Sequence, residues 1–287
     1  MFLGKKIRLE NYILDILKDG PKETLDLILR IKKQIPGTTK QGVYTALRVL
    51  NQEEIIIVSG GEVTLNILWL NRLAEYTRQA KNSYADSETE SEYFLRLENG
   101  DRAQYYFKNP ALLDSFWGHV LVELMRKVKN DPNMFSYNPH YWFLFGRRES
   151  ELQYLSCFPN YQKKFLLISA DKTALDKTVN QDQEKMTDYF QYCMLGKALF
   201  EKNNYYFNVI GDYLVEVLID KMTADEIELF YQKYEALNES RIKEFKGIIE
   251  RPGKNKFIIS KNPQKAARLR KKLVKFFYLT KDWPALT

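Results

Sequence analysis

The sequence predicts an α+β fold in two domains, and three observations carry this prediction. Near the N-terminus, three short segments with helical spacing of apolar residues lead into a β-hairpin with Gly60-Gly61 at its tip. The polar stretch NSYADSETES, residues 82–91, follows and is expected to be a linker. Beyond it, paired β-type segments alternate with helical segments, which favours a mainly antiparallel sheet covered on one side by helices.

The first two helices are short and amphipathic. The first is predicted from apolar residues at helical spacing, namely Leu9, Ile13, Ile16 and Leu17, and should end near Gly20. Pro21 suits the opening of the second helix, whose inner face we expect to be Leu25, Ile28 and Leu29. The turn Ile35-Pro36-Gly37 then separates the second helix from the third.

The third helix and the hairpin are the most informative part of the chain. Thr38 or Thr39 is expected to cap the helix, and its apolar face is Val43, Ala46, Leu47 and Leu50. The opposite face, called here the recognition face, consists of Lys40, Gln41, Tyr44, Thr45 and Arg48. These side chains are long or hydrogen-bonding, so they can reach base edges or phosphates. The β-branched segment Ile55–Val58 and the returning segment Val63–Leu65 form the hairpin.

This order of elements resembles the winged helix-turn-helix domain of bacterial and archaeal transcriptional regulators, over about the first quarter of the chain. The resemblance implies a recognition helix in the major groove, a wing beside the DNA backbone, and delivery by a dimer to two half-sites. Ser59, Gly60 and Gly61 stand at the wing tip, which departs from a basic wing because it carries Glu62 and no lysine or arginine. The alternative is a winged domain that makes only protein contacts.

We therefore expect residues 1–81 to bind DNA. Lys32, Lys33 and Lys40 should position the domain on phosphates, and the rest of the recognition face should read the groove. The full set of candidate contacts is Lys32, Lys33, Thr38, Thr39, Lys40, Gln41, Tyr44, Thr45, Arg48, Ser59, Gly60 and Gly61. The segment 67–81 has helical spacing and should connect this domain to the linker.

Charge is distributed unevenly around the net value of +7. Residues 1–82 carry 13 basic and 9 acidic side chains, residues 83–250 carry 20 and 27, and residues 251–287 carry 11 and one. Two basic ends around an acidic middle point to a polyanionic partner. No apolar run approaches the roughly 20 residues of a membrane span, and MFLGKKIRLE lacks a signal-peptide core, so we expect a cytoplasmic protein.

The last helix concentrates the C-terminal charge. Asn262 should cap it and Pro263 should open it, with an apolar side formed by Leu269, Leu273, Phe276 and Phe277. Its basic face consists of Lys265, Arg268, Lys271, Lys272 and Lys275. Three interpretations stay open: a helix docked by its apolar stripe with solvated lysines, a second DNA contact, or a helix on a membrane surface.

The domain at 92–287 is predicted element by element. Hairpins are expected around Asn99-Gly100 and Gly211-Asp212, with further strands at 141–145, 151–156, 164–169 and 256–260. Helices are expected from Asn109-Pro110, over 173–201, and from a capping box at 223–226. An aromatic cluster, Phe116, Trp117, Tyr137, Tyr141, Trp142 and Phe143, suggests a core between sheet and helices, or else a ligand pocket or dimer interface.

No motif indicates an active site, so we expect no catalysis and no cofactor. His119 and His140 lack neighbouring ligands at metal spacing; we expect a partly buried structural role for the first and a turn role for the second. The pairs Asp171/Asp176 and Asp182/Glu184 could hold Mg²⁺ but are expected to be solvated. Cys157 and Cys193 are expected to be buried as small apolar groups.

The whole chain faintly resembles archaeal winged-helix sugar sensors of the TrmB type, whose C-terminal domain resembles the phospholipase D fold. The resemblance rests on a basic winged N-terminus followed by a larger strand-and-helix domain. The histidine–lysine–aspartate motif of the active enzymes is absent, because neither His119 nor His140 is followed by a lysine two residues on. Phosphodiesterase chemistry should therefore be missing.

Together these patterns predict a sequence-specific DNA-binding transcriptional regulator. Double-stranded DNA is the expected partner, residues 92–287 should dimerise the chain or sense a small molecule, and no membrane association is expected. The first alternative is a replication initiator or a defence-associated DNA-binding protein, which the basic last helix favours. The second is a nuclease anchored by the winged domain.

Overall fold

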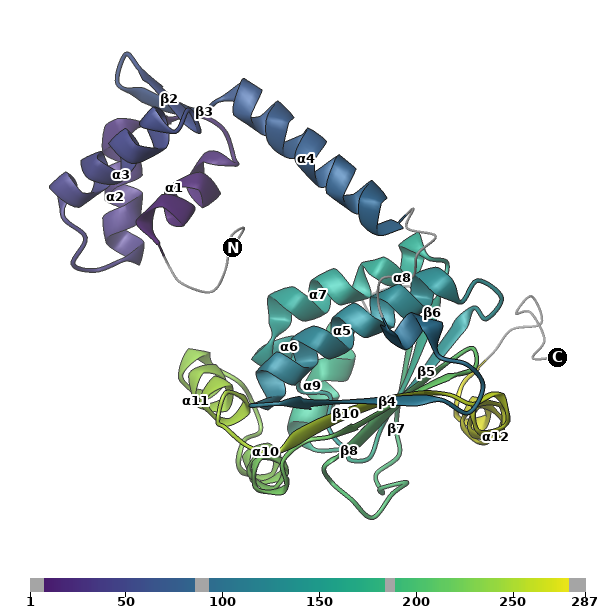
Figure 1. Cartoon of the computed structure of the whole chain (residues 1–287). Helices are drawn as coiled ribbons and strands as arrows, with labels where there is room; N and C mark the ends of the chain where they lie inside the picture. Colours follow the sequence, from purple (N-terminus) through teal and green to yellow (C-terminus); the bar gives the residue numbers. More distant parts are fainter. Residues whose placement is uncertain (1–7, 86–92, 184–188, 279–287) are drawn as a thin grey trace. The chain divides into compact units, whose positions relative to one another are not determined.

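The computed structural model describes residues 8–85, 93–183 and 189–278. The chain divides into two compact units, residues 1–89 and 90–287 (Figure 1). The first unit combines helices with a small three-stranded sheet, and the second is built on a seven-stranded mixed sheet with helices. The predicted α+β class is therefore confirmed. Among the described helices, none combines the length and the apolar character that crossing a bilayer requires.

The N-terminal unit has the predicted order of three helices and a hairpin. Its elements are α1 (Leu9–Leu17), β1 (Lys22–Glu23), α2 (Thr24–Gln34), α3 (Lys40–Gln52), β2 (Ile56–Ser59), β3 (Glu62–Leu65) and α4 (Ile67–Ala85). The strands pair antiparallel in the order β1-β3-β2. One apolar core joins the helices to the hairpin and includes Ile13, Leu17, Val43, Leu47, Ile56 and Val63.

The second helix begins later than predicted and buries a different face. Lys22 and Glu23 pair with β3 as a short strand, so α2 begins at Thr24 and not at Pro21. Leu27, Ile28 and Ile31 are buried, whereas Leu25 and Leu29 are 61 % and 67 % exposed. The predicted inner face was therefore wrong for two of its three residues, because the strand pairing sets where the helix starts and how it is turned.

The predicted linker is in part helical. α4 continues to Ala85, since the residues after Lys81 include no glycine or proline that would end a helix. Residues 86–91 of the predicted linker lie outside the described residues.

The C-terminal unit orders its strands β4-β10-β9-β8-β5-β6-β7. Its first half comprises η1 (Tyr93–Arg96), β4 (Arg102–Phe107), α5 (Pro110–Lys127), β5 (Asn133–Asn138), α6 (Phe143–Gly146), α7 (Arg148–Leu155), α8 (Cys157–Asn160), β6 (Lys164–Ser169) and α9 (Ala174–Gln183). The rest comprises β7 (Phe190–Met194), β8 (Tyr205–Ile210), β9 (Tyr213–Leu218), α10 (Lys221–Lys233), α11 (Glu239–Ile249), β10 (Asn255–Lys261), α12 (Pro263–Leu273) and η2 (Val274–Phe276). β5, β6 and β7 are parallel and the other pairs are antiparallel, so the sheet is mainly antiparallel as predicted.

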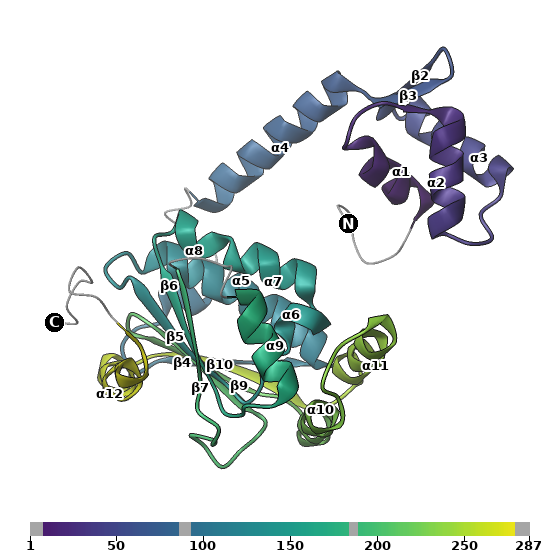
Figure 2. The ribbon, with the colours of Figure 1, turned by 180° about the vertical axis from the view of Figure 1, so that it is seen from behind.

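Both faces of this sheet are covered. Alternate residues of β5 face opposite cores, with Met134 on one side and Phe135 and Tyr137 on the other. The larger core joins the sheet to the helices α5 to α11; Figure 2 shows α9 on this side. α12 packs against the other face through Ala266 and Leu273. The expectation of helices on one side only was therefore wrong, because the last helix buries its apolar stripe on the opposite face.

Several elements of the C-terminal unit differ from the sequence prediction. Residues 93–96 form a 3₁₀ helix and only β4 follows Asn99-Gly100, so the hairpin predicted there is wrong. Consecutive Phe94 and Leu95 are both buried, which a strand with one buried face does not allow. The strands predicted at 141–145 and 151–156 fall in the helical segment α6–α7, and β5 was not predicted at all.

Further along the chain, one predicted helix is shorter than expected, one helix has a different cap, and one cap and one hairpin agree with the prediction. The helix predicted over 173–201 is described only to Gln183, and Phe190–Met194 is strand β7. Asp220, and not Thr223, caps α10, because its side chain accepts from the backbone N–H of Met222 and Thr223. Asn262 caps α12 by accepting from the Lys265 N–H, as predicted, and the hairpin β8–β9 around Gly211-Asp212 is confirmed.

Candidate functional site

The recognition face lies on the outside of α3. Thr39 caps the helix, since its Oγ1 accepts from the Gly42 N–H at 3.0 Å. The four predicted apolar residues Val43, Ala46, Leu47 and Leu50 are buried. Lys40, Gln41, Tyr44, Thr45 and Arg48 are therefore all exposed, as the helical period requires.

The wing is tied to the start of α2. Both the N–H and the Oγ1 of Thr24 donate to the Gly61 carbonyl oxygen, at 2.8 and 2.7 Å. Gly60 and Gly61 have φ angles of +60° and +85°, which glycine adopts without strain. These contacts hold the wing tip in place beside α3.

A groove of about 1010 Å³ separates α3 from the wing. It brings together predicted residues from distant parts of the unit, and its lining includes Gln41, Tyr44, Arg48, Gly60 and Gly61. The other predicted contacts do not line it, namely Lys32, Lys33, Thr38, Thr39, Lys40, Thr45 and Ser59. The groove also holds Glu23 and Glu62 on the wing side, so its basic wall is α3. The groove therefore has an acidic side at the wing and a basic side at α3.

Two members of the recognition face are restrained by neighbours on the helix. The Thr45 hydroxyl donates to the Gln41 carbonyl oxygen at 3.0 Å, which leaves its methyl group as the outward contact. The Lys40 ammonium lies 5.8 Å from the centre of the Tyr44 ring, within the range of a cation–π contact. These contacts limit the rotamers of Lys40, Tyr44 and Thr45.

The basic face of α12 is partly engaged within its own unit. Lys265 forms an ion pair with Glu216 at 3.1 Å, and Lys272 and Lys275 lie over the rings of Phe200 and Phe276. Arg268, Lys271, Lys272 and Lys275 are exposed. The docked stripe is confirmed for Leu273, which is buried, while Leu269 and Phe277 pack at its edge.

A cavity of about 370 Å³ lies in the C-terminal unit, lined by residues of α5, α7 and the sheet. Trp117 Nε1 donates to Asn208 Oδ1 at 2.6 Å, and Asn208 Nδ2 donates to Ser136 Oγ. The Oδ1 of Asn138, also in the lining, is buried without a hydrogen-bond partner among the described residues. The cavity is therefore largely apolar with a few fixed polar groups, a combination typical of small-molecule sites.

Most of the predicted aromatic cluster forms the core around this cavity. Trp117, Tyr141, Trp142 and Phe143 are buried in the larger core, and Tyr137 is buried in the core on the other face of the sheet. Trp142 and Phe143 stack with ring centres 4.0 Å apart. The core interpretation is confirmed, and Trp117, Tyr141 and Phe143 line the cavity as well.

Glu151 lines the cavity as a buried acid. It accepts a hydrogen bond from the Tyr141 hydroxyl. Burial, with a smaller contribution from the Asp114 charge, raises the pKa of Glu151 from 4.5 to about 8. The Tyr141 hydrogen bond and, to a smaller extent, the charge of Arg147, which is paired with Asp114 at 3.1 Å from Nε to Oδ2, compensate only part of this rise.

We expect the C-terminal unit to lose stability as pH rises. The folded chain retains a proton on Glu151 that the unfolded chain releases above its lower pKa, so the stabilisation is complete below about pH 4.5 and is lost as pH rises through about 8. Glu151→Gln, which imitates the neutral acid, should flatten the dependence of the free energy of unfolding on pH in this interval. Urea denaturation over a pH series measures it, and parallel curves for both proteins would refute this assignment.

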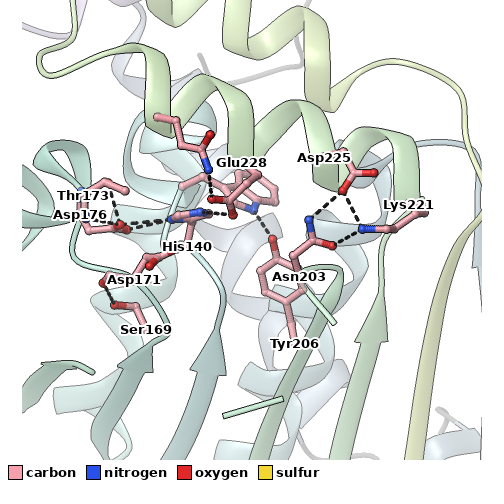
Figure 3. Close-up of polar contacts among 12 residues, drawn as sticks. His140, Ser169, Asp171, Thr173, Asp176, Asn203, Tyr206, Lys221, Asp225 and Glu228 are labelled. Carbon is pink, nitrogen blue, oxygen red and sulfur yellow. Dashed lines mark hydrogen bonds and ion pairs between the residues drawn. The ribbon is translucent and has the colours of Figure 1, made fainter. Parts of the chain in front are cut away.

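A cluster of polar groups that the sequence did not predict surrounds His140 in the C-terminal unit (Figure 3). His140 Nδ1 lies 3.2 Å from Asp176 Oδ2, and Nε2 lies 3.0 Å from Glu228 Oε2. His140 and Asp176 are buried, and Asp171 and Glu228 are partly exposed. Burial, the largest effect, lowers the pKa of His140, but the hydrogen bonds and charges of Asp176 and Glu228 together raise it to about 9. We call these four residues the His140 cluster.

Several expectations about these residues were therefore wrong. His140 has two carboxylate partners and not merely a turn role, and Asp176 is buried and not solvated. His119 is exposed, because it falls on the side of α5 opposite the buried Trp117 and Val120. Cys157 and Cys193 are only partly buried. Of the second acidic pair, Glu184 lies outside the described residues, as does the Asp182 side chain.

The sequence positions of His140 and Asp171 could have indicated the cluster, but only if strand β5 had been predicted. His140 and Asp171 each come two residues after a strand, β5 and β6, whose last residues Asn138 and Ser169 pair in parallel register. Neighbouring parallel strands bring their carboxyl ends to one edge, so the two side chains meet there. Without β5, this proximity could not be inferred.

Comparisons with known proteins give structural likenesses only. No family model and no curated protein matches the chain. One similar solved structure is TrmBL2, described as an archaeal chromatin protein with a novel mode of DNA binding; it is 10 % identical, with a TM-score of 0.31, over 93 % of this chain and 91 % of that one. Another is NucT from Helicobacter pylori, 10 % identical, with a TM-score of 0.34, over 61 % and 96 %. Neither likeness assigns a role to a residue of this chain.

Proposed function

We propose that the chain is a sequence-specific DNA-binding transcriptional regulator. The N-terminal unit would bind the duplex, and the C-terminal unit would dimerise the chain or sense a ligand. The observation that carries the proposal is the recognition face: five polar or basic side chains, exposed together on α3 beside a wing whose tip is fixed to α2. An exposed helix of this kind fits the major groove.

The residue roles follow from side-chain chemistry. Lys40, together with Lys32 and Lys33, would pair with phosphates and set the register on DNA. Arg48 and Gln41, which line the groove, would donate to base edges. The Thr45 methyl group would contact thymine, because its hydroxyl is engaged with the Gln41 carbonyl. A dimer would present two such surfaces to two half-sites.

The cavity supports the sensing part of this proposal. Its volume of about 370 Å³ lies within the usual range of roughly 300–1,000 Å³ for small-molecule sites. Asn138 Oδ1 offers a buried acceptor to a ligand that carries a donor. An effector bound there would contact both α5 and the sheet, whose relative position it could then stabilise.

The proposal includes no catalysis. His140 would be the candidate nucleophile for phosphodiester chemistry, but both of its ring nitrogens face carboxylates. Those carboxylates repel a phosphodiester and hold the nitrogen that would attack it.

The second candidate function, a replication initiator or defence-associated DNA-binding protein, is favoured by the exposed basic residues of α12.

Binding-site selection with the full chain, followed by footprinting, tests the proposal. We expect protection of two short inverted half-sites, with the DNA left intact after incubation with Mg²⁺ or Mn²⁺. Protection of tandem repeats would favour the initiator. Metal-dependent cleavage would establish the nuclease alternative, and no preference over random DNA would refute sequence-specific binding.

A separate prediction concerns α12 as a second DNA-binding surface. Replacing Arg268, Lys271, Lys272 and Lys275 by glutamine should make the plot of log affinity against log salt shallower by about 0.9 for each phosphate that the variant no longer neutralises. Lys221→Gln combined with Lys233→Gln is the control, since both are exposed lysines of the same unit. Affinity measured by fluorescence anisotropy over a salt series gives the slopes. Equal slopes for wild type and the four-residue variant would exclude α12 from the DNA interface.

A further inference from the structure

We propose that the His140 cluster is a binding site for one divalent transition-metal ion, with His140 Nε2 and one carboxylate oxygen each from Asp171 and Glu228 as ligands. Asp176 is the positioning residue. The three ligand atoms all lie within 4.8 Å of one another. An ion with bonds of about 2.0–2.2 Å brings its ligands within roughly 4.4 Å of each other, so small side-chain rotations complete the site.

The histidine is oriented for this role by its other ring nitrogen. Nδ1 faces Asp176, whose Oδ2 also accepts from the Thr173 hydroxyl at 2.8 Å and from the Thr173 N–H at 3.2 Å. Thr173 Oγ1 in turn accepts from the Asp176 N–H, so the pair forms a capping box at the start of α9. A carboxylate fixed in this way holds the proton on Nδ1, so a metal ion that binds takes the place of the proton on Nε2.

Packing also restricts how the ligands can move. The His140 ring stacks on the buried Tyr231 ring with centres 3.9 Å apart and an angle of 22°. Glu228 Oε1 accepts from Gln232 at 2.8 Å, which leaves Oε2 on the His140 side. Asp171 and Glu228 are partly exposed, so an ion can reach the site from solvent while the imidazole stays buried.

The charge of the cluster selects a cation. Three carboxylates surround one imidazole, and in the described part of the chain no lysine or arginine is ion-paired with any of them. A divalent ion would neutralise this excess negative charge. One nitrogen and two carboxylate oxygens suit Mn²⁺ or Zn²⁺ better than Ca²⁺ or Mg²⁺. Ca²⁺ and Mg²⁺ prefer ligand sets made of oxygen alone.

The site joins three elements that are distant in sequence. His140 follows β5, Asp171 lies between β6 and α9, and Glu228 belongs to α10. A bound ion would therefore fix α10 to the carboxyl ends of the parallel strands, and it should raise the thermal stability of the C-terminal unit. This inference does not depend on the DNA-binding proposal.

The test uses the full chain, stripped of metal with a chelator and titrated with MnCl₂ or ZnCl₂ by calorimetry, with Mn²⁺ EPR to count free ion. Asp171→Asn and Glu228→Gln remove one ligand charge each at partly exposed positions. Asp176→Asn keeps the ligands and alters only their support. His119→Gln and Asp225→Asn are the controls; Asp225 is an acid of α10 paired with Lys221. Circular dichroism of each metal-free variant checks that it is folded.

We expect one ion per chain in the wild type and in both controls. Asp171→Asn and Glu228→Gln should weaken binding at least about tenfold, and Asp176→Asn should weaken it by about 10- to 100-fold. The Zn²⁺ titration is repeated with Cys157→Ser and Cys193→Ser, which should not change the affinity. Absence of saturable binding up to about 1 mM metal, or equal affinity in wild type and both ligand variants, would overturn the proposal.

Discussion

Arg48→Ala is expected to weaken binding to a selected cognate duplex by about 1–3 kcal/mol, a loss of roughly 5- to 150-fold in affinity. Arg48 is exposed on α3 and lines the groove beside the wing. A guanidinium in this place can donate two hydrogen bonds to one guanine, and its removal leaves those acceptors unpaired. Fluorescence anisotropy on cognate and random duplexes at a fixed salt concentration measures the loss.

Arg78→Ala provides the matched control. Arg78 is an exposed arginine of the same unit, but it lies on α4 and is engaged with Glu75 on its own helix. Its removal should leave discrimination between cognate and random DNA unchanged. If Arg48→Ala weakens both duplexes equally, Arg48 is only a phosphate anchor and does not read sequence.

Trp142→Ala is expected to lower the free energy of unfolding of the C-terminal unit by about 3–5 kcal/mol. Trp142 is 1 % exposed, stacks on Phe143, and donates from Nε1 to the Tyr206 hydroxyl at 3.2 Å. The substitution removes a large apolar surface and also leaves the Tyr206 hydroxyl without that donor. Urea denaturation followed by circular dichroism measures the change.

Tyr106→Ala is the corresponding control, because Tyr106 is an aromatic residue of β4 that is 72 % exposed. Its replacement should cost no more than about 1 kcal/mol, the span of strand preferences. A loss below about 1 kcal/mol for Trp142→Ala would show that the aromatic cluster does not support the fold as described, since a core tryptophan costs more.

Most of the N-terminal unit could be predicted from sequence because its determinants are local. The apolar period of α3, the hydroxyl of Thr39 at its cap and the two glycines of the wing each act within a few residues. The face of α2 could not be predicted in the same way. Its rotation depends on β1, whose pairing with β3 joins residues about 40 positions apart in the chain.

The C-terminal unit was predicted less well because its central elements are buried on all sides. Residues 141–146 are all buried, so they show no period that distinguishes a helix from a strand. In β5, Asn133, Ser136 and Asn138 are buried polar residues. They interrupt the pattern of apolar residues that would otherwise predict a strand. The His140 cluster was missed as a consequence, since it forms where β5 ends.

In the function that we propose, the outward face of α3 enters a DNA duplex. Photo-crosslinking tests it most directly, with p-benzoyl-phenylalanine placed at Gln41 on that face or at Gln79 on α4, in the full chain bound to its selected site. We expect a DNA crosslink from position 41, at bases inside the protected half-site, and none from position 79. A crosslink from position 79 with none from position 41 would contradict it.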